Sequence, residues 1–325
     1  MERKIIAVLE GGYTDEAEIS YGTAAFVMDN IDRDLFDPVR CTIIENRWVA
    51  HVDQNEIPID RKDFSFKRAE VKIMPAAIFM AIHGTPGEDG ILQEYFERIG
   101  IPCNTGDAKN MALTFNKVDT TNALREAGFK VADSVLLTKN DNIDNERILE
   151  KTGLPCFVKP NNGGSSLGIS KVKEAEELPN AIERAFAEDE QVMIESFLEG
   201  TEVTCGVLKM NGKVQALPVT EVISMNEFFD YESKYTDGGN EEITPARLPM
   251  DVYEKCQRIS EAIYKALECR GIVRGDQMIH NGECSIIEVN TVPGMSAASI
   301  IPKQATAAGI AAKDMLTATL NDVLN

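Results

Sequence analysis

Two Asn-Gly pairs constrain the last third of the chain more tightly than any other feature of the sequence. Asn211-Gly212 and Asn281-Gly282 each lie between two apolar runs, within the segments 201–223 and 271–290. Asn-Gly is the strongest short-range signal for a hairpin, because both central residues of a tight two-residue turn have positive φ. The two segments are therefore predicted to form antiparallel hairpins.

The first third of the chain has a different rhythm, in which apolar runs alternate with helical patterns. The predicted strands and helices are 4–10, 17–31, 39–45, 76–82 and 89–100. Such βα alternation is typical of a parallel sheet with helices on its faces. A first domain is predicted to close near Gly106.

The middle of the chain mixes short strands and helices. Strands are predicted at 131–137, 156–160 and 191–198, and helices at 108–128, 145–152, 175–188 and 251–270. The predicted fold class is α/β, with a parallel sheet first and mixed or antiparallel sheets after it. At roughly 100–200 residues per domain, 325 residues correspond to two or three domains.

The charge balance excludes several classes of partner. Acidic residues outnumber basic residues by 53 to 33, which gives a formal net charge of -20. Nonspecific nucleic-acid binding needs a basic surface, so this balance argues against it. It argues equally against attachment to an anionic membrane. An anionic small molecule stays compatible, since a few lysines and a metal ion reverse the field within one cleft.

The sequence gives no indication of export or membrane insertion. The first apolar run is too short for a signal peptide and ends at Glu10, and no segment reaches the ~20 apolar residues of a spanning helix. The seven cysteines are scattered and mostly lie in apolar runs, as in reduced cytoplasmic proteins. With three histidines and no CxxC pair, the sequence does not suggest zinc.

The segment 156–170, CFVKPNNGGSSLGIS, joins two short apolar runs through a loop of asparagine, glycine and serine. Such a loop exposes several backbone N–H groups on one concave surface, an arrangement that binds phosphate oxygens. Lys159 precedes the glycines, so the segment is not a Walker loop. One interpretation is a flap over a phosphate with Lys159 beneath it. The other is a mobile hairpin tip with a solvated lysine.

The second hairpin carries four polar side chains. Glu288 and Asn290 share one face of its second strand, and Arg274 and Asp276 share one face of its first strand. Two carboxylates and an amide oxygen are hard ligands of the kind that Mg²⁺ takes. The alternative is a buried salt bridge between Arg274 and one carboxylate.

The length of the turn decides whether these four residues face one another. A two-residue turn at Asn281-Gly282 would place Asp276 and Glu288 on opposite faces of the sheet. A three-residue loop, His280-Asn281-Gly282, would place them on one face. If these residues form a metal site, the hairpin should therefore have the three-residue loop.

Two further polar residues follow predicted strands of the first third. Glu16 stands at a helix start after Gly11-Gly12, and His83 follows the strand 76–82. The glycine turn is not a GxGxxG motif, and a carboxylate there suits a ligand ammonium better than a phosphate. The alternatives are a glutamate that interacts only with the helix dipole and an ordinary turn histidine.

Taken together, these segments resemble the D-alanine–D-alanine ligase family of the ATP-grasp superfamily. The resemblance runs from end to end and rests on eight motifs in the family's order, namely GGYTDEAEIS, AIHGTPGEDG, FNKVDT, CFVKPNNGGSSLGIS, IESFLEGTEVT, DYESKY, VRGDQM and EVNTVPGMSAAS. It implies an N-terminal α/β domain, 1–106, and two ATP-grasp domains, 107–197 and 198–325, that clamp ATP between them. The implied reaction passes the γ-phosphoryl of ATP to one D-alanine. The amine of a second D-alanine then displaces phosphate, which yields D-alanyl-D-alanine for peptidoglycan.

The resemblance also implies roles for individual residues. The expected catalytic residues are Glu16, which holds the first substrate's ammonium, with Ser165, Tyr235, Arg274 and Ser299. The expected ATP-binding residues are Lys117, Lys159, Ser166, Glu195, Phe197, Leu198, Glu202 and Lys234. The expected substrate-binding residues are Glu16, His83, Arg274, Gly294 and Ser299. Asp276, Glu288 and Asn290 are expected to hold two Mg²⁺ ions, which Mn²⁺ can replace. The expected partners are ATP, D-alanine and a second copy of the chain, in the cytoplasm.

The polar segment 226–245 is long and without periodicity, which predicts a functional lid. It contains Tyr235, at a position where the family has tyrosine with a D-alanine acceptor and histidine with D-lactate. A protonated histidine repels the ammonium of D-alanine, whereas a phenol does not. Phe229 and Ala298 depart from the tyrosine and histidine expected there, which bears on acceptor affinity.

Three other functions are compatible with parts of the sequence. A D-alanine–D-serine or D-alanine–D-lactate ligase shares the same motifs. A nicotinamide oxidoreductase would use the βα start, but the GxGxxG motif is missing. A non-enzymatic nucleotide-binding protein would have no reason to keep the four polar residues of the second hairpin.

Overall fold

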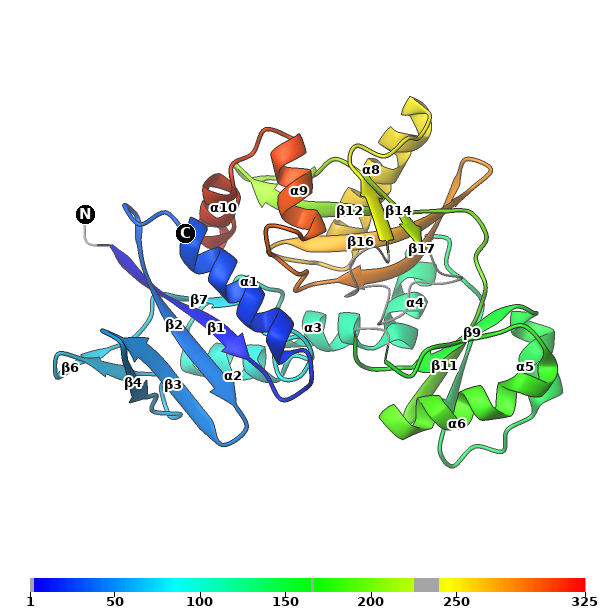
Figure 1. The fold of residues 1–325 in the computed structure, drawn as a ribbon, viewed down its shortest axis with the longest axis horizontal. Helices are drawn as coiled ribbons and strands as arrows, with labels where there is room; N and C mark the ends of the chain where they lie inside the picture. Colours follow the sequence, from blue (N-terminus) through cyan, green and yellow to red (C-terminus); the bar gives the residue numbers. More distant parts are fainter. Residues whose placement is uncertain (1–2, 165–166, 225–239, 325) are drawn as a thin grey trace.

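The computed structural model describes residues 3–164, 167–224 and 240–324. Three main sheets follow one another along the chain, from the blue N-terminal part to the orange and red C-terminal part of Figure 1. The first sheet has a parallel centre, and the other two are antiparallel. The predicted α/β class with mixed sheets is confirmed.

The first sheet has the strand order β4-β3-β2-β1-β7. Its parallel strands are β1 (Lys4–Gly11), β2 (Phe36–Ile44) and β7 (Ala77–Met80), and β3 (Arg47–Val52) and β4 (Asn55–Pro58) extend it antiparallel. A small separate hairpin consists of β5 (Phe66–Arg68) and β6 (Val71–Ile73). The sequence predicted the three parallel strands but none of these four short strands.

Two helices cover opposite faces of the first sheet. Ile6 and Val8 of β1 point into one core together with Val27 of α1 (Ala17–Asn30). The alternate residues of β1 point into a second core with Leu92 and Phe96 of α2 (Ile91–Ile99). This period-two alternation is the pattern of a strand that is buried on both faces.

The second sheet has the order β10-β9-β11-β8 and is antiparallel throughout. Its strands are β8 (Ser134–Thr138), β9 (Cys156–Pro160), β10 (Ser170–Val172) and β11 (Gln191–Ser196). One face packs against α5 (Asn145–Thr152) and α6 (Leu178–Glu188) through residues such as Val158 and Ile194. The opposite face carries Phe157, Lys159 and Glu195, which alternate with those core residues.

The third sheet has the order β15-β14-β12-β16-β17, with β13 also paired to β12. The strands are β12 (Thr201–Met210), β13 (Lys213–Ala216), β14 (Thr220–Ser224), β15 (Asn240–Ile243), β16 (Val273–His280) and β17 (Glu283–Asn290). Helix α8 (Met250–Ala266) covers one face through side chains such as Cys256 and Ile263. Both hairpins predicted from the Asn-Gly pairs are confirmed.

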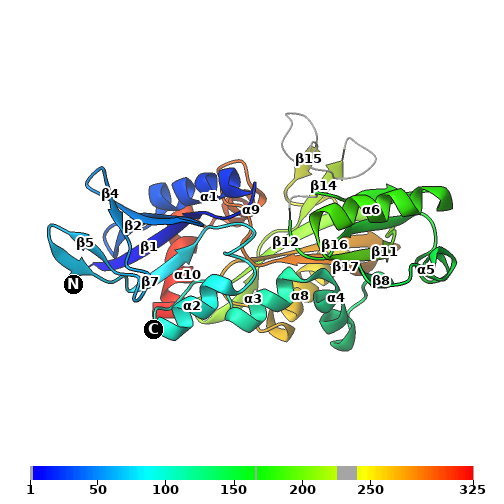
Figure 2. The same ribbon diagram turned by 90° about the horizontal axis from the view of Figure 1, so that it is seen from below.

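Helices connect the first sheet to the other two, as Figure 2 shows. The helix predicted at 108–128 is two helices, α3 (Ala108–Phe115) and α4 (Lys117–Glu126). The helix is interrupted at Asn116, which has ψ 112. Its side chain accepts a hydrogen bond from Asp119 N. Asn116 is therefore the N-cap of α4 and leaves Lys117 at the helix start.

The C-terminal helices return to the first sheet. Leu316 and Leu320 of α10 (Ala312–Leu324) share one core with β1, α1 and Leu208 of β12. Figure 1 shows α10 beside α1, with α9 (Ile300–Ala307) next to it. The division 1–106, 107–197 and 198–325 stays a prediction, and one of the three main sheets falls in each part.

The structure also shows the state of the cysteines and whether any described helix could cross a membrane. All seven cysteines are free thiols, and all but Cys103 are buried. Within the described ranges, none of the helices combines the length and the apolar character that crossing a membrane requires.

Candidate active site

A β-bulge determines which residues of the second hairpin share a face. His280 pairs with Glu283 across a two-residue turn, in which Asn281 and Gly282 have φ 50 and 76. The predicted three-residue loop is therefore wrong. The register shifts between Asp276 and Gln277, so that Asp276 lies opposite Glu288. The two-residue turn alone would have placed Asp276 and Glu288 on opposite faces of the sheet. One extra residue in β17 returns them to the same face.

The shared face carries a connected polar cluster. Arg274 donates to both carboxylate oxygens of Asp276, at 2.9 and 2.7 Å, and lies 3.8 Å from Glu288. Asn290 donates from Nδ2 to Asp276 at 3.1 Å and to Glu288 at 3.2 Å. The Thr204 hydroxyl of β12 donates to Asp276 as well. The salt bridge considered from the sequence is therefore present, and the two remaining predicted ligands belong to the same cluster.

The oxygen atoms of this cluster fit a hard cation. No group of three or more His, Cys, Asp and Glu side chains that could hold a metal occurs in the described residues, so Asn290 is needed as the third ligand. Holding Mg²⁺ requires the Asn290 amide to turn over, so that Oδ1 rather than Nδ2 faces Asp276 and Glu288. It also requires Arg274 to release one oxygen of Asp276. The donor set therefore fits Mg²⁺ after two side-chain rearrangements.

Two lysines converge at the base of the loop between β9 and β10. Lys159 is buried, and its Nζ lies 2.6 Å from Glu195 Oε1 on the neighbouring strand. Lys117 donates from Nζ to Gly163 O at 2.6 Å. Burial and the nearby Lys159 lower the pKa of Lys117 to about 8. An anion between the two ammonium groups would relieve this repulsion, which is the property expected of a phosphate site.

An aromatic shelf lies beside these lysines, where β11 leads into β12. The rings of Phe157 and Phe197 have their centroids 6.0 Å apart, and Lys171 Nζ lies 4.1 Å from the Phe197 centroid. Leu198 is half-buried next to Phe197, and Glu202 lies near the start of β12. Phe157 and Lys171 were not predicted as site residues, although they pair directly across β9 and β10.

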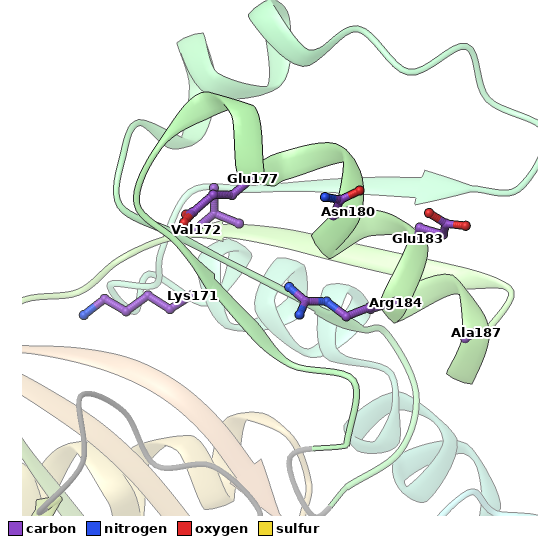
Figure 3. Close-up of a pocket in the computed structure, with 7 residues that line it drawn as sticks. All are labelled: Lys171, Val172, Glu177, Asn180, Glu183, Arg184 and Ala187. Atoms are coloured by element: carbon purple, nitrogen blue, oxygen red, sulfur yellow. The ribbon is translucent and has the colours of Figure 1, made fainter.

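A surface groove lies on the other side of Lys171. It is lined by residues of β10, of α6 and of the short 3-10 helix Ala175–Glu177 before α6, and Figure 3 shows that the Lys171 side chain extends away from α6. The Lys171 ammonium therefore belongs with the aromatic shelf rather than with the groove.

Glu16 lies between two glycines from distant motifs. A Cβ atom on Gly84 would stand 2.5 Å from Glu16 Oε2, and one on Gly164 would stand 2.7 Å from Glu16 Oε1. Both distances are far below a van der Waals contact, so a side chain at either position would displace the Glu16 carboxylate from where it lies. The structure thus brings together the glycine turn after β1, the turn after β7 and the loop of the second sheet.

His83 is buried behind this carboxylate site. Its Nε2 lies 3.0 Å from the hydroxyl oxygen of Thr23 in α1. Burial, together with the charge of Arg274, lowers the pKa of His83 to about 4. The imidazole is therefore neutral at pH 7, and it can act as a hydrogen-bond donor without a net charge.

Glu88 is a site residue that the sequence did not single out. It accepts a hydrogen bond from Gly84 N at 2.8 Å. Burial, the nearby Glu16 and, to a smaller degree, Glu288 raise the pKa of Glu88 to about 8. The negative charges of Glu16 and Glu288 are thus close enough to act on Glu88, and such a surrounding favours a cationic ligand such as an ammonium. A glutamate in a turn has no distinctive pattern, so its role depends on the fold.

The segment after β17 leads from Asn290 to helix α9 and contacts helix α1 through Met295. Ser299 is the N-cap of α9, and its Oγ accepts from Ser296 N at 2.9 Å. A Cβ atom on Gly294 would lie 3.6 Å from Ser299 Oγ, so these residues form one compact turn. Ala298, the departure noted in the sequence, is exposed.

Comparison with known proteins decides the family. Residues 5–106 match the family model "D-ala D-ala ligase N-terminus", and residues 123–321 match "D-ala D-ala ligase C-terminus". This chain belongs to the D-alanine–D-alanine ligase family. The D-alanine–D-alanine ligase of Christiangramia forsetii is 46% identical over 99% of each chain, and that of Flavobacterium johnsoniae is 46% identical over 97% of each chain.

Solved structures of the same family have the same fold. The VanG D-Ala:D-Ser ligase from Enterococcus faecalis is 32% identical, has a TM-score of 0.86, and is matched over 98% of this chain and 99% of its own. D-alanyl-alanine synthetase A from Vibrio cholerae is 26% identical, has a TM-score of 0.89, and is matched over 100% of this chain and 99% of its own. The predicted ATP-grasp fold of the ligase family is confirmed.

Several residues that the resemblance assigns in a ligase lie outside the described part of the chain. They are Ser165, Ser166, Phe229, Lys234 and Tyr235. The predicted lid, 226–245, also falls outside it up to residue 239, and Asn240–Ile243 forms β15. The structure brings the other predicted site residues into the clusters described above.

The raised pKa of Glu88 predicts a pH-dependent effect on ligase stability. Between the ordinary glutamate pKa of 4.5 and about 8, folded Glu88 keeps a proton that the unfolded chain has released. The contribution of Glu88 to stability is therefore greatest below that window and falls as the pH rises through it. Glu88→Gln should remove this loss while keeping an acceptor for Gly84 N–H.

We expect the Tm of Glu88→Gln to exceed that of the wild type at pH 8.5, by the equivalent of about 1–2 kcal/mol. At pH 5.5 the gain should be much smaller. Thermal unfolding of the ligand-free protein at both pH values measures this. Glu94→Gln, at an exposed position of α2, is the matched control. A gain that is equal at both pH values would contradict the raised pKa.

Proposed function

We propose that this chain is an ATP-dependent ligase that joins two D-alanines into D-alanyl-D-alanine and releases ADP and phosphate. Family membership over the full length supports the reaction class. The observation that carries the proposal is the shared face of Arg274, Asp276, Glu288 and Asn290. A bulge aligns these side chains at one end of a site that also holds two lysines and Glu16.

The nucleotide lies between the second and third sheets. Its base packs on the shelf of Phe157 and Phe197, and its phosphates lie between Lys117 and Lys159. Lys159 exchanges its partner Glu195 for a phosphate oxygen when ATP binds. Asp276, Glu288 and Asn290 would hold Mg²⁺, which would neutralise phosphate charge.

The first D-alanine lies at the Glu16 end of the site. Its ammonium pairs with the Glu16 carboxylate, which lies between Gly84 and Gly164. Neutral His83 donates to the substrate carboxylate. A carboxylate oxygen attacks the γ-phosphorus, and ADP leaves. Arg274 turns from Asp276 toward the transferring oxygens, where negative charge develops.

The second D-alanine lies near Gly294 and Ser299. Its unprotonated amine attacks the carbonyl carbon of the acyl phosphate. The carbon–oxygen bond to phosphate breaks, and the proton that the nitrogen loses as the amide forms passes to the departing phosphate. Ser299 and the turn around it hold the acceptor carboxylate. Two Mg²⁺ ions, a homodimer, a cytoplasmic location and a role in peptidoglycan synthesis complete the proposal, on the strength of the family resemblance.

Product analysis tests the proposed reaction. The protein is incubated with ATP, Mg²⁺ and either D-alanine, L-alanine or D-lactate, and ADP, phosphate and condensed products are measured. D-Alanine should give equal amounts of ADP, phosphate and dipeptide, whereas L-alanine should give almost none. Phosphate release from D-alanine without dipeptide, or equal rates with both enantiomers, would refute the proposal.

The choice of acceptor follows from Tyr235. A phenol is neutral at pH 7, with a reference pKa of about 10, so it does not repel an ammonium. With D-alanine and D-lactate at equal concentration, we expect mainly dipeptide at pH 7. Tyr235→His should shift the product toward the depsipeptide as the pH falls below about 6.5 and the histidine becomes charged. A wild-type preference for the depsipeptide at pH 7 would refute this role for Tyr235.

A D-alanine–D-serine or D-alanine–D-lactate ligase is the alternative within the family. A D-Ala:D-Ser ligase does occur among the similar structures, at 32% identity. The curated relatives at 46% identity are both D-alanine–D-alanine ligases, so this alternative is not favoured.

A further inference from the structure

One buried hydroxyl connects two loops of the site that lie far apart in the sequence. Thr23 in α1 is 1% exposed. Its Oγ1 accepts a hydrogen bond from Met295 N at 3.2 Å, and it lies 3.0 Å from His83 Nε2. The first partner belongs to the turn with Gly294 and Ser299, and the second follows β7.

The direction of these hydrogen bonds can be worked out from the protons available. A backbone N–H only donates, so the Met295 contact uses Oγ1 as an acceptor. The hydroxyl then has one proton of its own to donate. Of its two partners, only His83 Nε2 can take that proton. In a neutral imidazole with Nε2 as acceptor, the ring proton lies on Nδ1.

A threonine in a helix often donates its hydroxyl proton to a carbonyl oxygen of its own helix. Thr114 and Thr306 donate from Oγ1 to the carbonyl oxygen four residues before them, at 3.0 and 2.8 Å. Across the described ranges of the chain, Thr23 makes no such bond to its own helix. The hydroxyl proton of Thr23 is therefore available to His83.

We propose that Thr23 is a positioning residue that fixes His83 as the Nδ1–H tautomer and couples its loop to the acceptor turn. This rests on the proposed function, since it specifies how the first substrate is recognised. The fixed tautomer leaves Nδ1–H as the only donor of the ring, directed to the substrate carboxylate. The opposite tautomer would present a lone pair to that carboxylate and repel it.

Helix α1 gives the coupling a rigid frame. Glu16 is the N-cap of α1, and Thr23 follows it two turns later, on the same side of the helix. One helix therefore sets the positions of the ammonium-binding carboxylate, of His83 and of the Met295 backbone. Moving the acceptor turn relative to α1 would break the bond that holds His83 in its tautomer.

The tautomer can be measured directly in the wild-type protein. The chain has three histidines, so ¹⁵N-imidazole labelling gives a simple spectrum, and His83→Gln identifies the His83 signals. At pH 7 we expect Nδ1 of His83 to carry the proton and Nε2 to have the shift of an unprotonated nitrogen. A proton on Nε2 in the wild type would overturn the proposal without any variant.

Two variants test the role of the hydroxyl. Thr23→Val keeps the shape and removes the hydroxyl, and Thr23→Ser keeps the hydroxyl. Thr23→Val should move the His83 proton toward Nε2 and raise KM for the first D-alanine roughly tenfold or more, as expected for losing a hydrogen bond to a charged group. KM for ATP should stay within about twofold, a change of less than half a kcal/mol.

Thr23→Ser should restore the wild-type tautomer and most of the wild-type KM. If Thr23→Ser is as impaired as Thr23→Val, or if the tautomer is unchanged in Thr23→Val, the hydroxyl does not set the tautomer and the proposal is wrong. Failure of the proposed function has a different signature, namely a wild-type protein that forms no dipeptide. The tautomer measurement needs no turnover, so the two failures are distinguishable.

Discussion

Glu288→Gln is expected to lower turnover by about a thousandfold or more, while the protein stays folded. Glutamine keeps the shape of the side chain and can still accept from Asn290 Nδ2, as Glu288 does at 3.2 Å. It removes one of two negative charges from the proposed Mg²⁺ ligands. Because the Glu288 side chain is 36% exposed, the substitution should not destabilise the core.

Glu283→Gln is the matched control for this variant. Glu283 begins the same strand, but it pairs with Lys130 and Lys255 at 2.8 and 3.0 Å on the exposed side of the hairpin. Exposed pairs contribute little to stability, so this variant should turn over at nearly the wild-type rate. Circular dichroism and steady-state rates are compared for both variants. Near-normal turnover of Glu288→Gln at ordinary magnesium concentrations would remove Glu288 from the metal site.

Arg274→Lys is expected to lower kcat by roughly 10²–10³-fold. Lysine keeps a positive charge beside Asp276, so that carboxylate is not left buried without a partner. It cannot reproduce the two-pronged contact that Arg274 makes with Asp276, and it reaches the transferring oxygens less well. The loss should therefore appear in kcat, with only a small fall in Tm.

Arg68→Lys serves as the comparison, because Arg68 also pairs with a carboxylate, Asp37, in the first sheet. Its kcat should be unchanged. Separate measurements of kcat, of KM for ATP and of KM for D-alanine decide between the roles of Arg274. A variant with normal kcat and a raised KM for ATP alone would mean that Arg274 only binds the nucleotide.

The parts of the fold with strong local signals could be predicted from the sequence. The buried strands around β1 and the two Asn-Gly hairpins were predicted because periodicity and turn residues specify them locally. The short strands β3 to β6 were missed, since runs of three to six residues give little periodicity. The break at Asn116 had a local signal, an N-cap asparagine before a helical segment, but the helical pattern continues across it.

Arg274, Asp276, Glu288 and Asn290 do lie on one face, as the sequence predicted, but the three-residue loop given as the reason was wrong. The turn is the even one that Asn281-Gly282 favours, and a bulge corrects the parity between Asp276 and Gln277. Nothing in the local sequence marks a bulge at that point. It follows from the pairing of β16 with both of its neighbours, which is a property of the whole sheet.

Other site residues have no local signal. Thr23 is one of many helical threonines, and Glu88 is an acidic residue in a turn. Each acquires its role because a distant segment approaches it, Met295 in the first case and Glu16 in the second. Such contacts follow from the arrangement of the sheets and therefore could not be predicted from residue patterns.

The central claim is that this site activates a carboxylate as an acyl phosphate, and isotope transfer tests it most directly. D-Alanine labelled with ¹⁸O in both carboxylate oxygens is incubated with the protein, ATP and Mg²⁺, and the released phosphate is analysed by mass spectrometry. If a carboxylate oxygen attacks the γ-phosphorus and later leaves with it, each phosphate should carry one labelled oxygen. Unlabelled phosphate released in step with the dipeptide would contradict the acyl-phosphate route and the roles proposed here for the shared face of Arg274, Asp276, Glu288 and Asn290.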